Sequence, residues 1–129
     1  MSFEQNKAVV VRFGKAMDEQ DWAVLDTHPG LAEHMPFYQY LFAAFPDLRG
    51  KSETMVAEGD WVTERLTVSG TQKGEFLGIA PTGRKASWEV IAMYRLADGK
   101  IVKHRAQGDV TGIQRQLGAQ PTQPAPAAR

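Results

Sequence analysis

The sequence predicts a single α+β domain in which helices come first and pack on one face of a curved antiparallel sheet. Apolar residues recur at helical spacing as far as Pro46, and they alternate with polar residues from Gly50 onward. Helices followed by consecutive strands are typical of α+β layers. A chain of 129 residues suits one hydrophobic core, and we assign residues 1–118 to it. The remaining residues, 119–129, are rich in Pro, Ala and Gln and are expected to form a disordered tail.

Two helices are expected at the start of the chain. Ser2 and Gln5 have the spacing of a capping box, and Phe13 and Met17 lie on the apolar stripe of the helix that follows. Asp21 is a candidate cap for a short second helix, DWAVLD. The THPG segment then interrupts the helical pattern, since its Pro–Gly pair favours a turn.

A third helix is expected over PFYQYLFAAF. Pro36 suits its first turn, and Pro46 ends it. The pattern places Phe37, Leu41 and Phe45 on its buried face.

The strands begin after this helix. ETMVAEGDWVTERLTVSG reads as two strands joined by a turn at 58–60, and a third strand is expected near Thr71. GIAPTGRK is a loop, and ASWEVIAMYRL resumes as a long strand. Asp98–Gly99 indicates a hairpin to KIVKHRAQG. Asp109 then caps a last helix, VTGIQRQL.

The composition excludes several classes of function. Lys+Arg and Asp+Glu number 15 each, so no basic excess points to nucleic acid or to an acidic membrane surface. The absence of cysteine excludes disulfides and thiolate chemistry and is compatible with a cytoplasmic protein. We expect neither a signal peptide nor a membrane-spanning segment, since no apolar run is long enough.

His104 is the first candidate for chemistry. Strand alternation places Val102, His104, Ala106 and Gly108 on one face. It places Lys103 and Arg105 on the other face. An inward imidazole could serve as an acid or a base. The alternative is a buried histidine that is hydrogen-bonded for structure.

Glu64 is the second candidate. In WVTERLTVS it shares a face with Val62, Leu66 and Val68, so it lies among apolar residues. A carboxylate in such surroundings is a candidate general base. The alternative is that the strand twists or bulges and Glu64 pairs at the sheet edge.

The long strand has two different faces. Trp88, Val90, Ala92 and Tyr94 are expected to form a cavity wall or core. The opposite face carries the apolar pair Ile91 and Met93 between the charged side chains of Glu89 and Arg95. An apolar patch of this kind is usually covered, which predicts a homodimer through the sheet.

The remaining candidates are weaker. Tyr38 could carry a hydroxyl group to the mouth of a pocket, although packing on the sheet is the simpler interpretation. His28, His34 and His104 could form a three-histidine site, but nothing in their spacing requires one, and we expect no metal.

Three stretches resemble one known family: AAFPDLRG, GEFLGIAPTGRK and DGKIVKHR followed by QLG. Over most of residues 5–118 the chain resembles the SnoaL-like polyketide cyclases, which have the cone-shaped α+β fold of the nuclear transport factor superfamily. The resemblance implies a cofactor-free protein with a deep apolar cavity. The characterised cyclases close a ring by an intramolecular aldol condensation, with an aspartate two residues after the histidine as general acid/base.

The chain departs from this pattern at the site. Ala106 stands at the position of the aspartate, and Val90 and Ala92 stand where relatives carry polar side chains. The segment at 27–35 is also shorter than in relatives. We therefore expect a protein that binds, or performs altered chemistry on, a hydrophobic small molecule. The alternative is a cofactor-free cyclase, isomerase or epoxide-hydrolase-like enzyme that uses His104 and Glu64. The expected ligand-binding residues are Phe13, Met17, Tyr38, Trp88, Val90, Ala92, Tyr94 and Ala106.

Overall fold

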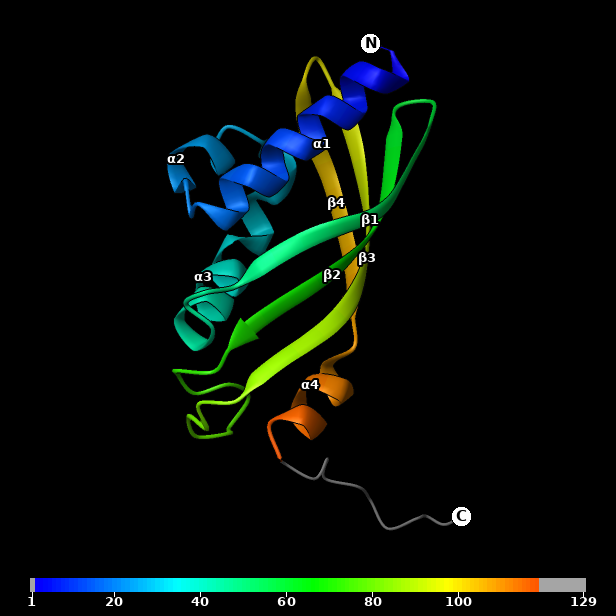
Figure 1. Ribbon diagram of the computed structural model, residues 1–129. Helices are drawn as coiled ribbons and strands as arrows, with labels where there is room; N and C mark the ends of the chain where they lie inside the picture. Colours follow the sequence, from blue (N-terminus) through cyan, green and yellow to red (C-terminus); the bar gives the residue numbers. More distant parts are fainter. Residues whose placement is uncertain (1, 119–129) are drawn as a thin grey trace, which may run out of the picture.

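The computed structural model describes residues 2–118 and has helices on one side of a strongly curved sheet (Figure 1). The first part of the chain forms α1 (Phe3–Asp18), α2 (Trp22–Leu25), the 3-10 helix η1 (Pro29–His34) and α3 (Met35–Ala44). The second part forms β1 (Arg49–Glu58), β2 (Trp61–Thr71), β3 (Lys85–Ala97), β4 (Lys100–Gly108) and α4 (Val110–Gln116). The α+β prediction is confirmed.

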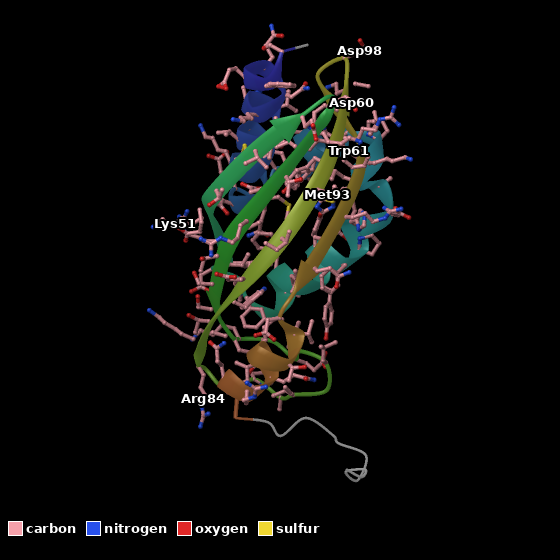
Figure 2. The ribbon with its side chains drawn as sticks, turned by 90° about the vertical axis from the view of Figure 1, so that its right-hand side faces the viewer. Lys51, Asp60, Trp61, Arg84, Met93 and Asp98 are labelled. Carbon is pink, nitrogen blue, oxygen red and sulfur yellow. The ribbon has the colours of Figure 1, made fainter. Side chains whose placement is uncertain are left out.

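The sheet has the order β1-β2-β3-β4, and each strand pairs antiparallel with the next. Figure 1 shows α1, α2 and α3 on one face and α4 at the far end of the sheet, after β4. Figure 2 shows the opposite face, which no helix of residues 2–118 covers; Met93 projects from its middle. The inner face therefore lines the interior, and the outer face meets solvent in the single chain.

The predicted helix caps are present. The Ser2 hydroxyl accepts from the backbone N–H of Gln5, whose side chain accepts from the Ser2 N–H. The Asp21 carboxylate accepts from Val24 N at 3.2 Å. The carboxylate of Asp109 accepts from Gly112 N at 2.9 Å, so this residue caps α4 as expected.

Two sequence predictions about the elements need correction. Phe45 at the end of α3 is fully buried as expected and Leu41 is half-buried, but Phe37 is 52% exposed. The buried residues within α3 are Tyr38, Phe42 and Ala44. The prediction misplaced Phe37 and missed Tyr38 and Phe42 because the helix is apolar over most of its circumference, and periodicity separates faces poorly in such a segment. The expected third strand near Thr71 is the end of β2; the chain from 72 to 84 contains only an isolated Phe76–Ile79 bridge.

A bulge in β4 changes the predicted alternation. Arg95 pairs with Lys103, but Leu96 pairs with Ile101, so Val102 is the extra residue. Ile101 is fully buried and Val102 is only partly so, which corrects the prediction that Val102 faces the interior. Beyond the bulge His104 is buried as expected, whereas Ala106 and Gly108 are exposed at the cavity.

The short segment between α2 and α3 packs against β4. A β-carbon at Gly30 would lie 2.4 Å from the backbone carbonyl carbon of Val102, so only glycine permits this close approach. The contact places η1 beside β4 and brings the start of α3 next to His104. The short segment thus packs on β4 and supports the strand beside His104.

None of the helices in residues 2–118 is long and apolar enough to cross a membrane. The expected tail, residues 119–129, lies outside the described residues.

Candidate functional site

A cavity of about 610 Å³ lies between the inner face of the sheet and the helices. Its walls come from α1, α3, the loop at Phe76, strands β1 to β4 and α4. All of the residues predicted to contact ligand line it: Phe13, Met17, Tyr38, Trp88, Val90, Ala92, Tyr94 and Ala106. Glu64 and His104 line it as well. The short 27–35 segment therefore leaves an open cavity in the cone.

Two rows of paired residues across the sheet organise the floor of this cavity. Glu64 pairs with Ala92, which pairs with Ala106. In the adjacent row, Val62 pairs with Tyr94, which pairs with His104. Glu64 and Ala106 thus share one row with a methyl group between them, about 10 Å apart, because neighbouring strands are spaced by about 4.8 Å.

Glu64 is a buried carboxylate with one side-chain partner. It is 8% exposed, and its Oε1 accepts a hydrogen bond of 2.9 Å from the hydroxyl of Tyr94. The pKa of Tyr94 is raised well above its usual value, first by burial and then by the Glu64 carboxylate, so Tyr94 keeps its proton and remains a donor. The hydrogen bond holds one oxygen of Glu64 at the cavity wall.

His104 is buried and held from two sides. The Tyr38 hydroxyl lies 2.9 Å from Nδ1 of His104, and Nε2 of His34 donates to the carbonyl oxygen of His104 at 3.0 Å. Desolvation lowers the pKa of His104 to about 4, with smaller contributions from His34 and Arg105. Burial raises the pKa of Tyr38. Near neutral pH the pair is therefore an uncharged imidazole beside a protonated phenol.

Tyr94 contacts both Glu64 and His104. Within residues 2–118 no hydrogen bond joins the two candidates. The Tyr94 ring instead stacks on the His104 ring, with centroids 5.0 Å apart and planes at 20°, while its hydroxyl binds Glu64. Phe13 contacts Tyr94 edge-on, at 5.4 Å between centroids. The sequence predicted all three residues at the cavity, and the tertiary structure adds the contacts that Tyr94 makes with the other two.

The other histidines have structural partners. His28 Nδ1 accepts from the backbone N–H of Ile101 at 3.0 Å, and burial is the main cause of its lowered pKa. The part of the chain that the structure describes contains no group of three or more His, Cys, Asp or Glu side chains that could hold a metal ion.

Sequence reasoning missed several residues that line the cavity. Phe42 has the helical spacing from Tyr38 that could have identified it. Phe76 lies in the glycine-rich loop between β2 and β3, and Ile113 lies in α4, one turn after the Asp109 cap. Strand alternation, which identified the other cavity residues, does not apply to either position. The other lining residues that were not predicted include Val10, Gly14, Leu41, Leu48 and Val110.

Comparison with known proteins identifies the family. The family model described as "SnoaL-like polyketide cyclase" matches residues 5–117. The chain belongs to the SnoaL-like polyketide cyclase family. It is 34% identical over 117 residues to the aklanonic acid methyl ester cyclase DnrD of Streptomyces peucetius, a match that covers 81% of each chain. A shorter match to the aklanonic acid methyl ester cyclase AcmA of Streptomyces galilaeus is 49% identical over 59 residues, which are 46% of this chain and 41% of that protein.

A solved structure supports the same assignment. AclR of Streptomyces galilaeus superposes with a TM-score of 0.85 at 29% sequence identity, over 98% of this chain and 88% of that one. The cone-shaped fold that the resemblance implied is therefore confirmed for this SnoaL-like chain.

Proposed function

We propose that this SnoaL-like protein binds an apolar, polyketide-like carbonyl compound and catalyses proton transfer on it without a cofactor, with Glu64 as the base. The observation that carries the proposal is the buried Glu64 carboxylate, which lines the apolar cavity and is held by Tyr94. A carboxylate among apolar groups is costly to bury, and perturbed or buried titratable groups concentrate at functional sites.

The cavity suits such a ligand. Its volume of about 610 Å³ lies within the usual range for small-molecule sites, and most of its lining side chains are apolar or aromatic. Curated relatives that share about a third of their residues with this chain carry the name of aklanonic acid methyl ester cyclases. We take a methyl ester with acidic hydrogens beside its carbonyl group as the substrate class.

The proposed step moves one proton. Glu64 removes a hydrogen from the carbon next to the carbonyl group, the C–H electron pair forms the enolate, and the negative charge moves to oxygen. The uncharged His104 and Tyr38 form a hydrogen-bonded pair on the same cavity wall and supply a donor for that oxygen. Return of a proton from Glu64 to carbon or oxygen completes the cycle.

The departure from the family concerns the aldol step. The resemblance places the acid/base aspartate at Ala106, and a methyl group transfers no proton. The Glu64 carboxylate belongs to the same row but to a strand two places away. It therefore meets a ligand from a different side, and we propose enolisation without efficient ring closure.

Hydrogen–deuterium exchange tests the proposal directly. The protein is incubated in D₂O with aklanonic acid methyl ester, and loss of the hydrogens beside the ester carbonyl is followed by NMR. Exchange that is faster with wild type than with Glu64→Gln, by roughly 10²-fold or more, is expected for a general base. Equal exchange with both proteins would contradict the role of Glu64.

Binding without chemistry is the second candidate, favoured by the alanine at position 106. Calorimetry with the same ester separates the two. Saturable binding together with exchange no faster than in buffer would establish a binding protein. Exchange that depends on Glu64 would establish an enzyme.

A further inference from the structure

Gly14 occupies an unusual position in α1. It lies well inside the helix (Phe3–Asp18), and its backbone has no positive φ. Glycine is among the poorest helix formers, because it loses the most backbone freedom on folding. A glycine at this place therefore needs a reason other than its conformation.

Close packing is not the reason. A β-carbon built at Gly14 would meet no atom within 4 Å, other than its chain neighbours and the backbone of its own helix. At Gly30 the same construction meets backbone atoms at 2.4 Å, so that glycine is required by the fold. Gly14 faces open space, and folding alone would favour alanine.

The open space belongs to the cavity. Gly14, Lys15 and Asp18 line it from α1, and Gly50 and Ser52 line it from β1. Apart from the half-buried Asp18, these residues are exposed, so they form a rim where the cavity reaches solvent between helix and strand. Asp18 Oδ1 accepts from Gly50 N at 3.1 Å and joins the two sides of this rim.

We propose that Gly14 is a specificity-determining residue: its missing side chain leaves room at the α1–β1 rim for a ligand that extends beyond the cavity. The inference rests on the proposed function insofar as it assumes that the cavity binds an apolar carbonyl compound. A ligand that does not reach the rim does not need the gap, whereas a long ligand of several fused rings that extends from the inner wall to the rim does.

The test compares Gly14→Ala with Gly14→Leu. Alanine and leucine are both good helix formers, so both variants should keep or raise the melting temperature. The probes are methyl benzoate, with one ring, and methyl anthraquinone-2-carboxylate, with three, and dissociation constants are measured by calorimetry. Gly14→Leu should weaken binding of the three-ring ester by at least about tenfold and leave the one-ring ester unchanged, as expected when a hydrophobic site loses volume.

Arg12→Leu is the control for an added apolar side chain, since Arg12 is exposed on α1 and does not line the cavity. It should not alter the affinity for either ester. Unchanged binding of the three-ring ester to Gly14→Leu would overturn the inference alone, and so would equal weakening for both esters. Absence of binding of either ester to the wild-type protein would overturn the inference and the proposed function together.

Discussion

The hydroxyl of Tyr38 lies 2.9 Å from Nδ1 of His104, although the two residues are 66 positions apart in the chain. The contact depends on the close packing of η1 on β4, which brings the first turn of α3 to the inner face of the sheet. It holds an uncharged imidazole on the wall of the cavity.

We predict that the ring of His104 titrates at about 4 in the native protein. Desolvation disfavours the imidazolium form, and the Glu64 carboxylate that could oppose this is bonded to Tyr94 instead. NMR titration of the ring in wild type and in Glu64→Gln should give coinciding curves. A clearly higher pKa in wild type than in the variant would show that the two groups interact directly. A value of 6.5 in both would show that His104 is not interior.

We predict that acid destabilises the fold through His104. Its folded pKa is lower than its unfolded value, so the unfolded state binds more protons between pH 6.5 and about 4. Stability should be fully retained above pH 6.5 and should fall as the pH decreases toward 4. Since one pKa unit corresponds to about 1.4 kcal/mol, the loss is about 3 kcal/mol. Urea unfolding across this range measures it.

The matched variant for this experiment is His104→Gln. The pH dependence of its unfolding free energy should be smaller than that of wild type by about the His104 contribution. A residual dependence of the same sign is expected, because the pKa of His28 is also lowered by burial. Identical pH dependence in wild type and variant would contradict the prediction.

We predict that Tyr94→Phe costs about 1–3 kcal/mol of stability, because it removes the donor to a buried carboxylate. The ring stacking on His104 is retained in this variant, so the loss reports the hydroxyl group. Tyr40→Phe provides the comparison: the Tyr40 hydroxyl donates to Glu75 and accepts from Leu77 N at an exposed site, where water can replace both partners, so its loss should cost less. Urea unfolding of both variants measures the loss of unfolding free energy. An equal loss in both would mean that the Glu64–Tyr94 hydrogen bond stabilises the fold no more than an exposed one.

We predict that the native protein does not cyclise aklanonic acid methyl ester at a useful rate, and that Ala106→Asp increases the rate. The added carboxylate would stand at the position of the family's acid/base aspartate, and a well-placed group of this kind contributes about 10²–10⁴-fold. Chromatography of the product measures the rate. Efficient cyclisation by wild type would show that the reaction does not require a carboxylate at position 106. An unchanged rate in Ala106→Asp would show that this carboxylate alone does not restore cyclisation.

We predict a homodimer through the outer face of the sheet. Ile91 and Met93 are 45% and 43% exposed in the single chain, and alternation along β3 places Arg95 on the same face. Figure 2 shows Met93 on this face. Met93→Lys should convert the dimer to a monomer in sedimentation at high micromolar concentration, because a charge would be buried. Val24→Lys is the control, since Val24 is equally exposed, at 43%, but lies on α2. A wild-type monomer would contradict the prediction.

Local patterns were enough to predict the elements and most of the inner face. Caps such as Ser2 and Asp109 act within a single turn, and alternation along β3 depends only on strand geometry, so both can be recognised from neighbouring residues. Glu64 was found in the same way, as a charge on an apolar face.

The tertiary structure decided what neighbouring residues do not encode. The bulge at Val102 depends on how β4 pairs with β3, and the buried face of α3 depends on what packs against an almost uniformly apolar helix. The hydrogen bond from Tyr94 to Glu64 joins residues 30 positions apart, and the contact of Tyr38 with His104 joins residues 66 positions apart. These contacts form only when the chain closes around the cavity, because hydrogen bonds between distant residues require the backbone that aligns them.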